Sequence, residues 1–128
     1  MSALRDEARA PNTAPERLTE LAHLEGDRGD IDSDAGWCRE YVAANINTPL
    51  ATLQELAADM NDCMARRNAA KNPMLDKATL WLMIEDRDDL TADAARERLG
   101  LAPKPRLNAI ARAVHIPVVD PKTGRIIR

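Results

Sequence analysis

Histidine and serine are scarce in this 128-residue chain, and their spacing does not favour catalysis. His23 and His115 each lack a cysteine or carboxylate at the spacing of a proton-transfer pair, so both are expected on the surface or in packing. Ser2 and Ser33 are the only serines, and neither lies in a Gly-x-Ser-x-Gly turn. The five glycines do not form a phosphate-binding loop. These patterns predict a protein that is not an enzyme and has no catalytic residues.

The acidic segment 25–36, EGDRGDIDSDAG, is the one candidate for a metal site. Its alternating carboxylates, as in a calcium-binding loop, are Asp30, Asp32 and Asp34. Position six of such a loop should be glycine and is Ala35, and position twelve should be glutamate and is Tyr41. We therefore expect a solvated acidic loop, with no metal and no cofactor.

Cys38 and Cys63 are too few for a disulfide scaffold and lack metal-ligand spacing. The chain opens without a charged-then-apolar leader, and no run of about 18 apolar residues could span a bilayer. The expectation is a soluble, cytoplasmic protein with free thiols and no membrane contact.

The composition favours helices. Most apolar residues are Ala and Leu, the only aromatic residues are Trp37, Tyr41 and Trp81, and there is no Phe. Ala and Leu are good helix formers, and β-branched residues are scarce before the last fifteen positions. A chain of this length forms one compact domain or one domain with a small appendage, so an all-α body is predicted.

The charge is divided unevenly between the two ends of the chain. Residues 1–100 contain 12 Lys/Arg and 20 Asp/Glu, a net charge of −8, whereas residues 101–128 contain 6 and 1, a net charge of +5. A basic end of this kind often binds phosphates or acidic partners. A solvated tail that balances its own domain is the equally open alternative.

The segment VAANINTPLATLQELAAD, residues 42–59, has counterparts elsewhere in the chain. A shift of 35 aligns Asn12, Thr13, Leu18, Leu21 and Ala22 with Asn47, Thr48, Leu53, Leu56 and Ala57. A shift of 27 aligns Arg39, Asn45, Leu53, Leu56 and Asp59 with Arg66, Asn72, Leu80, Met83 and Asp86. A repeated register predicts three stacked units, with about eight extra residues in the first.

Each unit is expected to contain two short helices. Thr48 before Pro49 predicts a helix start, because the hydroxyl can cap the helix and proline at its first position loses no hydrogen bond. An apolar stripe follows, formed by Leu53, Leu56 and Ala57. The upstream helix is expected to end at Asn45, a residue that tolerates a left-handed terminus. Neither helix can bury its apolar face alone, so stacking on neighbours must stabilise both.

The pattern Val-Ala-x-Asn-x-Asn-Thr-Pro-x-x-x-Leu-x-x-Leu-Ala-x-Asp at residues 42–59 resembles the variant leucine-rich repeat. The resemblance extends over about residues 8–90 and is weakest at 69–86, where Leu75 and Asp76 replace Thr-Pro. It implies an all-helical solenoid of alternating α- and 3₁₀-type helices in a right-handed superhelix. The founding member of the family binds an iron–sulfur cluster through clustered cysteines, which this chain lacks, so that cofactor is not expected.

The predicted organisation is three repeats in residues 1–89, at about 8–36, 37–63 and 64–89, followed by a separate segment, 90–128. That segment predicts a helix, a turn, a second helix and a small β-hairpin. Thr91 is expected to cap the first helix and Gly100 to end it. The second helix would carry the apolar stripe Leu107, Ile110, Ala111 and Val114.

Residues 90–128 resemble the winged helix-turn-helix of excisionase-type and mercury-regulator-type DNA-binding proteins. The matching positions are Leu90, Thr91, Ala94, Ala95, Leu99, Gly100, Ile116, Pro117, Gly124 and Arg125. Pro103 and Pro105 in the turn, and one extra residue before Pro117, depart from the pattern. The resemblance implies that Arg106, Asn108 and Arg112 would face the major groove. Phosphates would be contacted by Lys122, Arg125 and Arg128.

Two functional hypotheses follow. The first is a non-enzymatic interaction module, in which a short right-handed solenoid binds a protein partner of unknown identity through Trp81, Arg66 and Arg67. A core role for Trp81 is the favoured alternative to a binding role, because the chain has few large side chains to fill its interior. The second hypothesis is a regulator that binds duplex DNA through residues 101–128, with the acidic repeats forming dimer or partner contacts.

Overall fold

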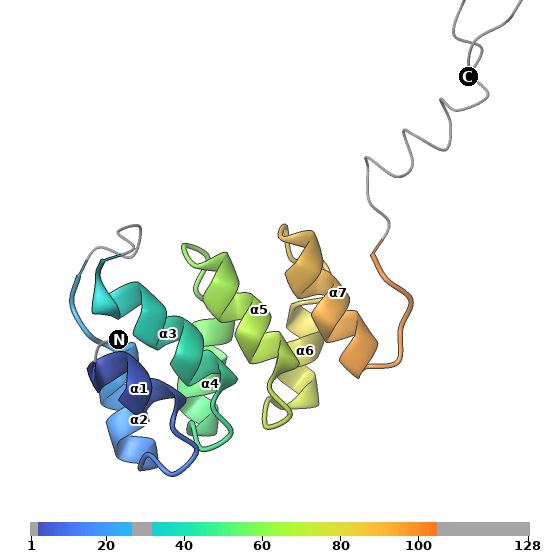
Figure 1. Ribbon diagram of the computed structural model, residues 1–128. Helices are drawn as coiled ribbons and strands as arrows, with labels where there is room; N and C mark the ends of the chain where they lie inside the picture. Colours follow the sequence, from blue (N-terminus) through green and yellow to red (C-terminus); the bar gives the residue numbers. More distant parts are fainter. Residues whose placement is uncertain (1–2, 27–31, 105–128) are drawn as a thin grey trace, which may run out of the picture.

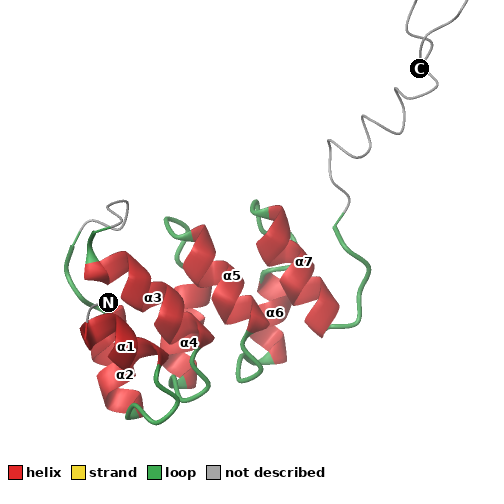
Figure 2. Cartoon of the chain, in the orientation of Figure 1, coloured by secondary structure: helices red, strands yellow, loops and turns green. Residues whose placement is uncertain are grey.

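The computed structural model describes residues 3–26 and 32–104, and in these ranges it contains seven helices and no strand (Figure 2). The helices are α1 (Ala3–Arg9), α2 (Pro15–Ala22), α3 (Asp34–Ala44), α4 (Leu50–Ala57), α5 (Cys63–Lys71), α6 (Lys77–Leu82) and α7 (Asp89–Arg98). The predicted all-α body is therefore confirmed. The predicted second helix and hairpin of the C-terminal segment lie outside the described residues. None of the described helices has the length and apolar character that a membrane span requires.

The helices form two rows. Helices α1, α3, α5 and α7 lie side by side in chain order, and α2, α4 and α6 form the second row (Figure 1). Helix α2 packs against α1 and α3, and α4 packs against α3 and α5. Helix α7, which the sequence assigns to a separate segment, packs beside α5 and α6. The chain thus alternates regularly between the two rows.

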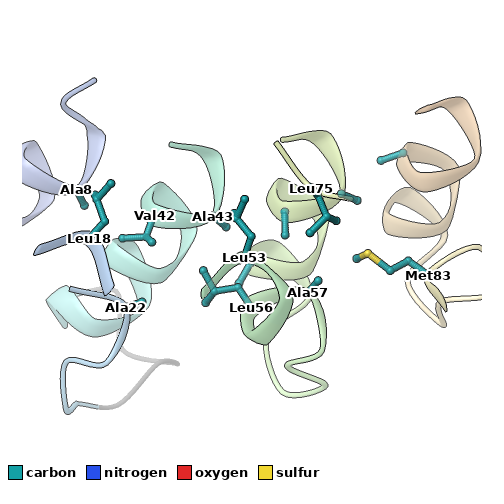
Figure 3. Packing of buried hydrophobic residues seen from close by; sticks show 14 of the residues in the cluster. Ala8, Leu18, Ala22, Val42, Ala43, Leu53, Leu56, Ala57, Leu75 and Met83 are labelled. Atoms are coloured by element: carbon teal, nitrogen blue, oxygen red, sulfur yellow. The ribbon is translucent and has the colours of Figure 1, made fainter. Parts of the chain in front are cut away.

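A continuous apolar core lies between the rows (Figure 3). The second row supplies buried leucines, namely Leu18, Leu21, Leu53, Leu56 and Leu80. The first row supplies mainly smaller residues: Ala8, Val42, Ala43, Ala69, Ala70 and Ala95. Small residues let neighbouring helices approach closely, and the leucines fill the remaining volume. This combination of leucines in one row and small residues in the other explains how a chain with only three aromatic residues fills its core.

The threonine of the Asn-Thr-Pro motif closes one helix and does not begin the next. Thr48 Oγ1 donates to Val42 O at 2.6 Å, and the start of α4 has no side-chain cap. The same bond occurs between α1 and α2, where Thr13 Oγ1 donates to Glu7 O at 2.5 Å. Thr13 and Glu7 lie 35 positions before Thr48 and Val42, respectively. The predicted capping role of Thr48 is therefore wrong, because the hydroxyl satisfies a carbonyl at the end of α3.

Two first-row helices begin at an aspartate. Asp62 accepts a hydrogen bond from Ala65 N at the start of α5, and Asp88, 26 residues later, accepts one from Thr91 N at the start of α7. The predicted cap at Thr91 is wrong, since Thr91 is buried inside the helix. Gly100 has φ +75° directly after the last turn of α7, as predicted for a helix stop.

Asparagine side chains join successive first-row helices at their carboxyl ends. Asn45 Nδ2 donates to Ala8 O at 2.9 Å and Ala10 O at 2.8 Å. Asn72 Nδ2 donates in the same way to Ala43 O and to Asn45 O, both at 2.9 Å. Asn45 has φ −82°, so the left-handed terminus expected there does not occur. The Asn45 amide instead bonds to carbonyls at the end of α1. We call the bonds donated by Asn45 and Asn72 the asparagine ladder.

Candidate protein-binding surface

Arg66, a predicted partner-binding residue, is buried. Its side chain is 1 % exposed, and the guanidinium holds both carboxylate oxygens of Asp86 at 2.8 and 2.9 Å. Its Nη1 also donates to Asp59 O at 2.9 Å. The hydrogen bond to Asp86 raises the pKa of Arg66, against the opposing effect of burial. A guanidinium enclosed in this way cannot also bind a partner, so Arg66 has a structural role.

The same arrangement occurs one unit earlier. Arg39 Nη2 contacts Asp59 Oδ2 at 2.6 Å, and the two side chains are 8 % and 12 % exposed. Arg39 Nη1 donates to Ala22 O at 2.8 Å. Both arginine–aspartate pairs join a first-row helix to the turn that follows the next second-row helix. The shift of 27 that aligns Arg39 with Arg66 also aligns Asp59 with Asp86, so the sequence shows that both residues recur but not that they pair.

Arg67 joins α5 to the start of α7. Its guanidinium lies 3.3 Å from Asp88 Oδ2, and its side chain is 19 % exposed. Burial alone would raise the pKa of Asp88, but the hydrogen bond from Thr91 and the charge of Arg67 lower it overall. Arg67 also lines a small pocket of about 210 Å³ between α5 and α7. Because the Arg67 side chain is paired with Asp88 and mostly covered, little of it is available to a partner.

Trp81 lies on the surface of α6, so the expectation of a core role is wrong. Leu80 and Met83 are three positions apart and both face the interior, where they are 1 % and 3 % exposed. Trp81 and Leu82 lie between them and point outward, with 51 % and 85 % of their surface exposed. A short helix can bury only one narrow face, and here that face is taken by Leu80 and Met83.

Leu82 borders a groove of about 490 Å³ between α4 and α6. The groove is lined by Gln54, Ala57, Ala58, Met60, Thr79, Leu82, Met83 and Asp86. Met60 is 48 % exposed, so two apolar side chains at this groove are largely open to solvent. The sequence analysis missed Met60 and Leu82. Each is an apolar residue that lies close to the predicted stripe in the sequence, and tertiary packing leaves both uncovered.

A second, more polar pocket of about 500 Å³ shares Met60 with this groove. Its lining residues are Met60, Asn61, Cys63, Arg66, Arg87 and Asp88. The Arg87 guanidinium donates to Met60 O and so crosses from the turn after α6 to the turn after α4. The exposed Cys63 thiol is accessible at this pocket, whereas Cys38 is buried. Burial raises the pKa of the Cys38 thiol to about 11.

No group of metal-ligating side chains is found in the described parts of the chain. Asp34 instead forms an ion pair with Arg5 at 2.9 Å, and Asp30 lies outside the described residues. All of the predicted DNA-binding residues also lie outside them, namely Arg106, Asn108, Arg112, Lys122, Arg125 and Arg128. Of the three predicted partner-binding residues, only Trp81 is largely exposed, and it precedes the groove residue Leu82 in the sequence.

The chain matches no family model, no curated protein and no solved structure.

Proposed function

We propose that this chain is a non-enzymatic scaffold of the variant leucine-rich repeat type, which binds a protein partner at the groove between α4 and α6. The observation that carries the proposal is the 85 % exposure of Leu82 at the edge of an apolar groove. Burial of a leucine side chain contributes about 1.5–3 kcal/mol. The exposed ring of Trp81, next to Leu82, offers a second large apolar surface to the same partner.

Recurrent contacts support the solenoid interpretation. The threonine-to-carbonyl bonds, the asparagine ladder and the arginine–aspartate pairs each occur in two successive units at the register of the repeats. Helix α7 extends the series, because Arg98 lies 26 residues after Asn72 and donates to Ala70 O and Asn72 O at 3.4 and 2.5 Å. We therefore interpret α7 as the first helix of a fourth, incomplete unit.

The same contacts favour a groove that is formed before its partner arrives. Bonds between side chains and backbone carbonyls hold each unit in a fixed position on the preceding one. A preformed surface loses little conformational freedom on binding, so more of the contact energy appears as affinity. This is the mechanism that we propose for the scaffold: rigid presentation of Trp81, Leu82 and Met60.

A photo-crosslinking amino acid at position 82 of the full chain tests this function in the cells that make the protein. We expect it to capture a protein partner that the same amino acid at Ile46 does not capture. Ile46 is a matched control, because it is 55 % exposed and does not line the groove. Leu82→Asp should abolish co-purification of the captured partner, and Ile46→Asp should not. Failure of position 82 to capture any protein would contradict the proposal.

The uneven charge of the chain favours a second function, in which residues 101–128 bind duplex DNA with their net charge of +5. We expect such binding to weaken steeply as salt increases, because released counterions drive it. The double substitution Arg106→Glu, Arg112→Glu should abolish it. Electrophoretic mobility measurements on nonspecific duplex DNA at about 50 mM salt provide the test. Absence of a shifted band under these conditions would exclude this function.

A further inference from the structure

We propose that the partner segment in the groove between α4 and α6 is an amphipathic α-helix whose polar face is basic. This inference rests on the proposed function and names the chemistry of the partner. The elements that form the groove, the small and flexible residues that line it, and the charge around it support the choice.

The elements around the groove favour a helix over an extended peptide. An extended peptide usually binds by adding a strand to an open sheet edge, and residues 3–26 and 32–104 contain no strand. The walls of the groove instead come from α4, α6 and the turns that follow them. An amphipathic helix can place apolar residues at positions i, i+3 and i+7 into such a groove.

The lining residues suit close contact with a helix. Ala57 and Ala58 have short side chains, so a helix backbone can approach the end of α4 closely. Met60 and Met83 are unbranched and adapt to side chains of different shape. Leu82 extends furthest into solvent and can insert between successive turns of the bound helix. Together these residues form an apolar site without a buried unpaired charge.

The charge around the groove favours a basic partner. Residues 50–62 and 76–89 contain eight acidic residues and two basic ones. Four arginines of neighbouring helices, Arg39, Arg66, Arg67 and Arg96, pair with five of the acids: Asp59, Asp62, Glu85, Asp86 and Asp88. Counted against these four arginines, Lys77 and Arg87, the eight acids leave an excess of two negative charges. Residues 1–104 as a whole contain 13 basic and 20 acidic residues, a net charge of −7, which attracts a basic segment.

The same charge argues against a second copy of this chain as the occupant. Two groove regions facing one another would bring together two acidic surfaces. Like charges placed opposite one another oppose association. Residues 105–128 of the same chain contain 5 basic residues and 1 acidic residue, so they are the main competitor that the test must separate from an external helix.

A displayed library of randomised 16-residue peptides, selected against the full chain, tests the inference. We expect enriched peptides to share apolar residues at helical spacing and an excess of Lys and Arg. Synthetic copies should gain helical circular dichroism on binding. Leu82→Asp should weaken their binding at least tenfold, because a leucine contact is lost and a like charge is placed at the groove. Ile46→Asp should leave the affinity unchanged.

Enrichment of acidic peptides, or of peptides without helical spacing, would overturn the inference. So would binding that Leu82→Asp does not weaken. Crosslinks from position 82 to residues 105–128 of the same chain, or to a second copy, would assign the groove to those occupants. If position 82 captures a protein whose bound segment is not a basic helix, the inference fails and the proposed function stands. If it captures no protein, both fail.

Discussion

The two cysteines differ in their surroundings, and this difference has a measurable consequence. Cys63 is exposed at the start of α5, and Cys38 is buried in α3. A thiol reagent attacks the thiolate, so exposure and pKa together decide its rate. We expect the native protein to react rapidly at one thiol and the unfolded protein at two, as counted by mass spectrometry. Rapid labelling of Cys38 in the native state would contradict the packing of α3.

The pKa of Cys38 also predicts how stability depends on pH. Burial, assisted by the charge of Asp34, raises the pKa from 9.0 to about 11, so the native state keeps the proton that the unfolded state loses. The native state then binds more protons, and the free energy of unfolding falls as pH rises from about 9 to about 11. Urea unfolding across this range should show the fall. Cys38→Ala should remove this contribution, and the control Cys63→Ala should retain it.

Exposed and buried leucines of the second row should respond differently to substitution. Leu53 is 0 % exposed, and Leu53→Ala leaves a cavity, which costs about 2–5 kcal/mol. Leu82 is 85 % exposed, so Leu82→Ala should change the free energy of unfolding by less than about 0.5 kcal/mol. Chemical denaturation of both variants provides the measurement. Equal losses would mean that Leu82 is covered within the protein, which would weaken its assignment to a partner.

At the scale of the elements, the asparagine ladder is the main polar link between first-row helices. Asn72→Ala removes three hydrogen bonds, the two that Nδ2 donates to Ala43 O and Asn45 O and the one that Oδ1 accepts from Met74 N. We expect a loss of about 2–4 kcal/mol. Asn68→Ala is a matched control in the same helix, because Asn68 makes one part-buried bond to Glu40 O. Thermal unfolding should show a loss of about 1 kcal/mol for the control. Equal losses for Asn72→Ala and Asn68→Ala would contradict a special role of the asparagine ladder in stability.

The arginine–aspartate pairs link the two rows and should be strongly coupled. Arg66→Met or Asp86→Asn alone leaves one buried charge without its partner, which costs about 3–5 kcal/mol. The double variant should lose much less than the sum of the single losses, and a double-mutant cycle measures this difference. The exposed pair Arg17–Glu7 is the control, and its coupling should be much weaker because solvent screens it. Additive losses at Arg66 and Asp86 would show that the pair does not act as a unit.

At the scale of the whole molecule, the positions that correspond to Asn45 and Asn72 hold other residues after α1 and in α7. Ala10 occupies the position that corresponds to Asn45, and its carbonyl accepts a hydrogen bond from Asn45 Nδ2. At the other end, Arg98 replaces asparagine and donates to carbonyls of four residues, Ala70, Asn72, Pro73 and Leu75.

The sequence by itself determined the all-helical class and the apolar stripes, because these depend on residue types and on their spacing along the chain. It could not determine the roles of Thr48, Arg66 and Trp81, since each depends on what the neighbouring unit places opposite it. Thr48 meets the end of α3, Arg66 meets Asp86, and Trp81 meets solvent. Only the tertiary structure decided which polar groups are buried together and which apolar residues remain exposed. Burial is a property of packed neighbours, so the candidate site emerged from the structure.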